Sequence, residues 1–93
     1  MNQLIASEIL NEQIAELRTI SYAALSSRIE TTDVRKVIGR DGTTYKIEIN
    51  YFWDGRKGGE VRVIASIDDG GSSAFVPLTD DFIKAADETF VGE

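Results

Sequence analysis

The sequence predicts an α+β fold in which two N-terminal helices pack on one face of a four-stranded antiparallel β-meander. Two observations carry this prediction. All eight glycines fall from Gly39 onward, so the preceding segment lacks these residues, which commonly mark turns. After that point, short runs alternate between apolar and polar residues and are separated by glycine-containing turns, which is typical of hairpins. The chain has 93 residues, the size of one small domain, and we expect residues 1–93 to form a single domain.

The N-terminal segment has helical periodicity. Its apolar residues recur every three or four positions and form one stripe: Ala6, Ile9, Leu10, Ile14 and Leu17. Three glutamates lie on a neighbouring face without a basic residue four positions later, and we expect them to be unpaired: Glu8, Glu12 and Glu16. The helical pattern resets near Thr19–Ser21. Ser21 is a good N-cap for a second short helix, from Tyr22 to about Ile29, that buries Leu25 and Ile29.

Two hairpins follow. Asp41-Gly42 is a strong turn signal, and a two-residue turn there pairs Ile38 with Tyr45 and sets Arg35 opposite Glu48. In the second hairpin, matching the apolar residues on one face gives the pairs Trp53–Val61, Tyr51–Val63, Ile49–Ala65 and Ile47–Ile67, and sets Lys46 opposite Asp68. We expect Ile49, at the centre of the middle strand, to be fully buried.

The last third of the chain has a less regular pattern of apolar and polar residues. A turn at Asp69–Ser72 leads to a short strand over Ser73–Val76, which Pro77 ends because proline cannot donate to a ladder. Thr79 then resembles an N-cap, with a helical turn over Asp80–Ala85.

The strand alternation assigns side chains to two faces of the sheet. The face under the helices is expected to hold Ile38, Tyr45, Ile47, Ile49, Tyr51, Val61, Val63, Ala65, Ile67 and Val76. The opposite face is mainly polar but carries Phe52, Ile64 and Phe75. We expect the C-terminal segment to lie at an edge of the sheet or across this far face, where it would cover those three residues with Phe82, Ile83, Phe90 and Val91.

Composition excludes several functional classes. The chain has no Cys and no His, which removes disulfides, thiol nucleophiles and the commonest general base. It shows no signal peptide and no apolar run long enough to span a membrane, so we expect a cytoplasmic protein without membrane contact. The net charge is −6, and residues 64–93 hold seven acidic residues and one basic residue. This acidity argues against a nucleic-acid partner.

Four carboxylates lie near turns: Asp68, Asp69, Asp80 and Asp81. They could bind a divalent metal or form an acid–base pair, but their spacing matches no EF-hand loop, and turn or helix-start roles are favoured. We therefore expect no catalytic residue, no cofactor and no metal.

The most distinctive segment is the tip of the second hairpin. It places Trp53 and Asp54 beside two cations, Arg56 and Lys57, within a run that contains three glycines. An aromatic residue next to Arg and Lys is common at protein interfaces. The competing interpretation is a solvated turn in which Trp53 closes the core. The apolar end of the far face, with Phe52, Ile64 and Phe75, is the second candidate for an interaction site.

Several motifs resemble a group of short bacterial proteins of unknown function. The segments are WDGRKGGEVRV (Trp53–Val63), IDDGG (Ile67–Gly71), PLTDDFI (Pro77–Ile83) and the ending FVGE (Phe90–Glu93), within a resemblance that covers roughly residues 20–93. The resemblance implies a bacterial, cytoplasmic origin and brings no activity, ligand or partner.

Three hypotheses for function remain open. The first is a small acidic, non-enzymatic module that binds another protein, as a monomer or a weak homodimer. The second is an acidic decoy or regulator that engages a basic partner through the glutamate stripe and the acidic C-terminal third. The third is a metal-binding enzyme that uses carboxylates alone.

Overall fold

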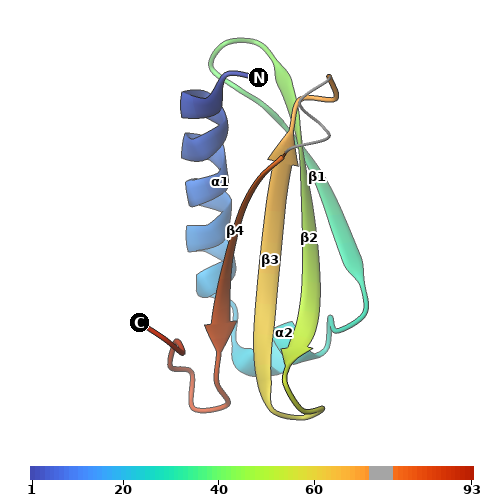
Figure 1. The fold of residues 1–93 in the computed structure, drawn as a ribbon, viewed down its shortest axis with the longest axis vertical. Helices are drawn as coiled ribbons and strands as arrows, with labels where there is room; N and C mark the ends of the chain where they lie inside the picture. Colours follow the sequence, from blue (N-terminus) through green and yellow to red (C-terminus); the bar gives the residue numbers. More distant parts are fainter. Residues whose placement is uncertain (72–76) are drawn as a thin grey trace.

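The computed structural model describes residues 1–71 and 77–93, and within these residues the chain has the predicted α+β class (Figure 1). Two helices come first, α1 over Gln3–Arg18 and α2 over Tyr22–Ser26. An antiparallel sheet follows, with its strands side by side in chain order: β1 Thr32–Ile38, β2 Thr44–Asp54, β3 Glu60–Asp68 and β4 Leu78–Lys84. The expected strand over Ser73–Val76, including Phe75, lies outside the described residues.

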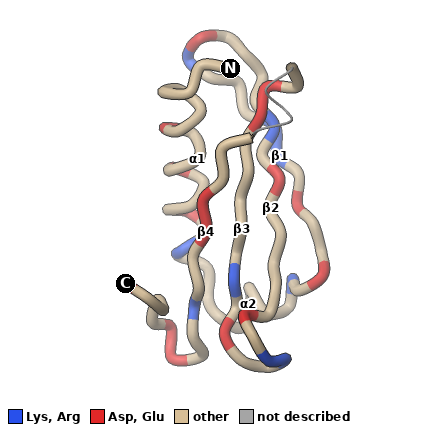
Figure 2. Tube along the Cα trace, viewed as in Figure 1, with Lys and Arg blue, Asp and Glu red and all other residues tan. Residues whose placement is uncertain are grey.

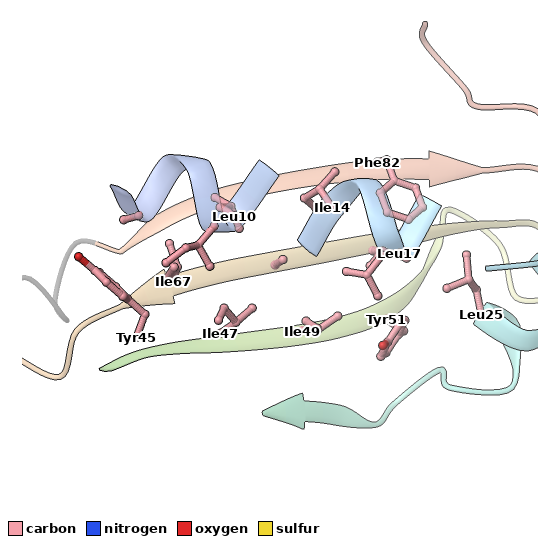
Figure 3. Packing of buried hydrophobic residues seen from close by; sticks show 14 of the residues in the cluster. Leu10, Ile14, Leu17, Leu25, Tyr45, Ile47, Ile49, Tyr51, Ile67 and Phe82 are labelled. Atoms are coloured by element: carbon pink, nitrogen blue, oxygen red, sulfur yellow. The ribbon is translucent and has the colours of Figure 1, made fainter. Parts of the chain in front are cut away.

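Helix α1 is amphipathic, as its periodicity predicts. Asn2 caps it by accepting a hydrogen bond from the backbone N–H of Ile5 (3.1 Å). The apolar face lies against β3 and β4, and its side chains point toward the strands (Figure 3). The predicted stripe is confirmed, and the buried residues of α1 are Ile5, Ala6, Ile9, Leu10, Ile14 and Leu17.

Helix α2 is shorter than predicted. Ser21 is its N-cap, as expected, and accepts a hydrogen bond from the Ala24 N–H (3.2 Å). Leu25 is fully buried, but the helix ends at Ser26, and Ile29 beyond it is only half-buried. Helix α2 contacts β2 and β3 near one end of the sheet, so α1 alone runs along the length of the sheet (Figure 1).

The register of β2 and β3 is the predicted one. Trp53 faces Val61, and Lys46 faces Asp68. Ile49 is 0% exposed, as expected for the centre of the middle strand. Figure 3 shows the inward side chains of β2 and β3 facing those of α1. The buried residues on these two strands are Tyr45, Ile47, Ile49, Tyr51, Val61, Val63, Ala65 and Ile67.

The predicted register of β1 and β2 is wrong by one residue. The N–H of Gly39 donates to the Thr43 carbonyl (2.8 Å), and the N–H of Gly42 donates to the Gly39 carbonyl (2.9 Å). The loop therefore contains three residues, Arg40–Gly42, with Gly42 in the left-handed region at φ 79°. The Asp41 carboxylate holds this longer loop by accepting from the Thr43 N–H and the Tyr45 hydroxyl.

Because the loop has one more residue than predicted, the inward and outward faces of β1 are exchanged. Ile38 faces Thr44 rather than Tyr45 and is 74% exposed, so its predicted place in the core is wrong. Arg35 lies opposite Ile47, on the α1 side of the sheet, and not opposite Glu48. This outcome follows from the period of two along a strand, because a shift of one residue exchanges the two faces.

The predicted helical turn over Asp80–Ala85 is wrong, and Thr79 is not an N-cap. Residues 79–84 lie in β4, where Phe82 faces Val63 and is 3% exposed. The local N-cap signal is weak compared with two gains from strand pairing. Pairing satisfies the backbone groups of β3, and it also buries the ring of Phe82.

The C-terminal segment lies at the β4 edge. Its backbone follows β4, since the Val91 N–H donates to the Ile83 carbonyl (2.9 Å). Phe90 packs edge-to-face on Phe82, with ring centroids 5.8 Å apart. Of the four residues proposed to cover the far face, Ile83 lies there, whereas Phe82 and Phe90 pack on the α1 side.

Lys84 is buried at the point where α1 ends and is 5% exposed. Its ammonium donates to the backbone carbonyls of Arg18 (3.0 Å) and Ile20 (2.7 Å). The Glu88 carboxylate lies 3.6 Å from this ammonium and accepts from the Tyr22 backbone N–H (2.9 Å). A cation at the end of α1 and an anion at the start of α2 both match the helix dipoles. These two side chains link the segment around β4 to both helices.

The last residue of the chain is held by α1, and this contact predicts a pH response. Arg18 lies over the Phe90 ring, 3.7 Å from its centroid, and donates two hydrogen bonds of 2.7 Å to Glu93. The hydrogen bond from Arg18 lowers the pKa of Glu93 below the ordinary glutamate value. Because the folded pKa is depressed, the contact stabilises the chain above the ordinary pKa of glutamate. That contribution is lost as pH falls through the lowered value.

The measurement is an NMR titration of the Glu93 side chain. We expect its pKa to lie below that of a free glutamate and to rise toward the ordinary value in Arg18→Gln. An identical Glu93 titration in both proteins would show that Arg18 does not hold the carboxylate in solution.

Candidate functional site

The sheet face that points away from α1 carries a half-exposed aromatic residue. We call this side of the sheet, which points away from α1, the outer face. Phe52 on β2 is 47% exposed there and faces Arg62 on β3, which in turn faces Ile83 on β4. Ile64, half-buried, lies on the same face one pair away. The structure thus brings Phe52 and Ile64 together as predicted, while Phe75 lies outside the described residues.

Arg62 is fixed beside Phe52 by carboxylates from both neighbouring strands. Its guanidinium donates to Asp54 on β2 (3.1 Å from Nε) and to Asp81 on β4. The hydrogen bond to Asp54, with the charge of that carboxylate, raises the pKa of Arg62. Both bonds restrict the long side chain, so its ordering cost is met before any partner arrives.

Trp53 lies on the other side of the sheet. It faces Val61, is half-buried and packs against the core. Asp54, its neighbour, points to the outer face and pairs with Arg62. The aromatic residue beside the hairpin tip on the exposed side is therefore Phe52.

The loop between β2 and β3 exposes two cations. Arg56 and Lys57 are exposed, and neither has an ion-pair partner among residues 1–71 and 77–93. The loop itself is anchored, because the Tyr22 hydroxyl of α2 donates to the Gly59 carbonyl (2.7 Å). The cations thus project from a supported turn.

A groove of about 520 Å³ lies between this loop and the turn that follows β4. We call it the tip groove. Small and charged residues line it: Asp54, Arg56, Gly58, Gly59, Glu60, Ala85, Ala86 and Asp87. Figure 2 shows the basic residues of the loop and the acidic residues of the turn after β4 at the same end of the molecule. Asp54 belongs both to the groove and to the Arg62 cluster, so the two surfaces adjoin.

The sequence placed Ile83 over the far face and Asp81 among the turn carboxylates, but it did not indicate the pair of Arg62 with Asp81 or the second wall of the groove. Both depend on β4, which the sequence placed too early in the chain. The alternation in Leu78–Lys84, with Phe82 and Lys84 on one face, is the signal that could have located it.

The acidic residues singled out in the sequence are largely engaged. Glu8 pairs with Arg40 (3.2 Å) and Glu16 with Arg35 (3.5 Å), so the expectation of an unpaired glutamate stripe is wrong at these two positions. The four turn carboxylates accept backbone or guanidinium hydrogen bonds: Asp68 from Gly70, Asp69 from Gly71, Asp80 from Asp81, and Asp81 from Arg62.

Residues 1–71 and 77–93 contain neither a cluster of metal ligands nor a membrane-spanning helix. No group of three or more Asp or Glu residues lies close enough there to hold a metal ion. Neither helix combines the length and the apolar character that a membrane crossing requires.

Comparison with protein-family models, curated proteins and solved structures finds no match for this chain. The resemblance of its WDG, DDGG and FVGE segments to short bacterial proteins therefore stays a prediction.

Proposed function

We propose that this protein is a non-enzymatic protein-interaction module that binds its partner with the outer face around Phe52 and the adjoining tip groove. The observation that carries the proposal is Phe52, 47% exposed next to an arginine that two carboxylates hold in place. Aromatic residues and arginines dominate the binding energy of protein interfaces. A large exposed aromatic ring on a rigid sheet is also costly to leave in water.

The charges around the groove favour a particular kind of partner segment. Arg56 and Lys57 have no ion-pair partner in the described chain, whereas Asp54 is already neutralised by Arg62. A segment that packs an apolar side chain on Phe52 and places a carboxylate near Arg56 would complement both features. The partner we propose therefore presents a hydrophobic residue next to an acidic one.

An acidic regulator of a basic partner is the second candidate. It is favoured by the net charge of −6 and by the exposed acidic residues of β4 and the turn after it. It is weakened by the internal pairing of Glu8 and Glu16. A carboxylate-based metal enzyme has less support, because the turn carboxylates are occupied by hydrogen bonds from the chain itself.

The test is affinity capture from lysate with quantitative mass spectrometry, using Phe52→Ala and the double variant Arg56→Ala/Lys57→Ala. We expect both to lose most of the same partner. Thermal stability of the double variant should stay within about 0.5 kcal/mol of the unsubstituted protein, since both side chains are exposed.

Matched controls use the same substitutions elsewhere on the surface. Leu4→Ala removes a large apolar side chain that is 66% exposed on α1, and Lys36→Ala/Lys46→Ala removes two exposed cations from the opposite end of the sheet. Both should retain the partner. A partner retained by the Phe52 and tip variants but released between roughly 0.1 and 0.5 M salt would instead support the acidic regulator.

A further inference from the structure

The two edges of the sheet differ in the pairing of their outer backbone groups. At the β4 edge, the C-terminal segment bridges Lys84 with Phe90, and the Val91 N–H donates to Ile83. At the β1 edge, no backbone group of residues 1–71 or 77–93 pairs with the outer side of Thr32–Ile38. Figure 1 shows β1 at the side of the sheet away from α1 and the C-terminus. An edge strand of this length can add a further strand.

The hairpin fixes which residues of β1 offer their backbone to such a strand. Gly39 hydrogen-bonds to Thr43 across the hairpin, so the odd-numbered residues of β1 direct their backbone groups toward β2. The even-numbered residues Thr32, Val34 and Lys36 direct theirs away from the sheet. The side chain of Val34 is also 56% exposed.

We infer that the β1 edge binds a second copy of this chain, with the two β1 strands antiparallel about a two-fold axis that passes through Val34. In this arrangement each Val34 hydrogen-bonds to its counterpart, and Asp33 of each copy lies directly opposite Arg35 of the other. These charged residues form a non-hydrogen-bonded pair, the type in which side chains come closest. The result is a continuous eight-stranded sheet with both α1 helices on one face.

Charge selects this register over its neighbours. Moving the axis by one residue toward the N-terminus places Asp33 against Asp33. Moving it by one residue toward the C-terminus places Arg35 against Arg35, and a further step places Lys36 against Lys36. Like charges directly opposite each other destabilise a strand pair. An isologous dimer needs a self-complementary surface, and among these four registers only the Val34-centred one provides it.

The two charged side chains are already held at the edge. The Asp33 carboxylate accepts a hydrogen bond from the Tyr51 hydroxyl (2.6 Å), and Arg35 donates to the Gln13 side chain (2.7 Å). Both therefore require little ordering when the second copy arrives. The inference is independent of the proposed function, because the tip groove lies on a different loop and stays free in the dimer.

The first experiment is sedimentation velocity on the native chain over a wide concentration range, together with Val34→Pro. Proline removes an N–H that points away from β2, so the hairpin ladder keeps its hydrogen bonds. We expect a concentration-dependent dimer for the native chain, and a monomer with an unchanged circular dichroism spectrum for Val34→Pro. If that variant fails to fold, Val34→Lys takes its place, because it sets two lysines against each other at the axis. Thr44→Lys, an exposed outer-face position on β2, is its matched control.

The second experiment tests the register itself by mixing two variants. Asp33→Arg alone and Arg35→Asp alone each place like charges opposite one another, and each should weaken the dimer about tenfold or more. An equimolar mixture restores opposite charges at both pairs, so a heterodimer should form. A native chain that stays monomeric at every concentration would overturn the inference. A dimer that survives Val34→Pro, or a mixture that fails to associate, would also overturn it.

Discussion

Ile49→Ala is expected to lower the free energy of unfolding by about 2–5 kcal/mol, the range for deleting a large buried side chain. Ile49 is 0% exposed at the centre of β2, where β1 and β3 pair on either side and α1 lies over the face. A domain of this size has a total stability of about 5–15 kcal/mol, so the loss is a large share. Urea unfolding followed by circular dichroism gives the value.

The matched control is Ile38→Ala, the same substitution one strand away. Ile38 is 74% exposed, and its removal should change stability by no more than about 0.5 kcal/mol. A large loss for Ile38→Ala, or a loss below about 1 kcal/mol for Ile49→Ala, would contradict the assignment of faces along β1 and β2.

Lys84→Met is expected to cost about 2–3 kcal/mol, although it replaces a polar side chain by an apolar one of similar length. The ammonium donates to two carbonyls at the end of α1, and hydrogen bonds from charged groups are the stronger ones. Methionine would leave those carbonyls without this donor and Glu88 without its neighbouring cation. The measurement is again the free energy of unfolding, with Lys57→Met on the exposed loop as the control.

The desolvation cost of the buried ammonium opposes the gain from its hydrogen bonds, and the Lys84→Met experiment shows which is larger. Burying an ammonium costs desolvation energy, and some buried ion pairs can be replaced by apolar residues without loss of stability. A Lys84→Met variant as stable as the native chain would mean that this desolvation cost cancels the two hydrogen bonds. Glu88→Gln removes the negative charge but keeps a hydrogen-bond acceptor, because the amide oxygen can still accept from the Tyr22 backbone N–H. We expect it to cost less than Lys84→Met.

The register of β2 and β3 could be predicted because both strands carry long apolar alternation on one side. Any slip would expose the whole set from Tyr45 to Tyr51 at once. Strand β1 has no such constraint. Its apolar residues Val34, Val37 and Ile38 fall on both faces, so the assumed loop length alone decided its orientation. Asp41-Gly42 is compatible with loops of two or of three residues, and the sequence does not distinguish them.

The candidate site likewise contains some residues that the sequence could place and others that it could not. Phe52 and Ile64 were placed together because they belong to the well-determined pair of strands. Of the two partners of Arg62, Asp54 lies on the correctly paired strand β2, whereas Asp81 reaches Arg62 only through the pairing of β3 with β4. That pairing joins segments that are distant along the chain, and local turn and cap signals do not encode it.

The contacts of Lys84, Glu88 and Glu93 with the helices have a consequence for biosynthesis. Helix α1 is translated before the groups that satisfy its last carbonyls and hold its final arginine. While the segment between them is being synthesised, the nascent chain exposes the apolar face of α1, and such surfaces attract chaperones or aggregate. The helix is secured only after the segment from Lys84 to Glu93 has emerged.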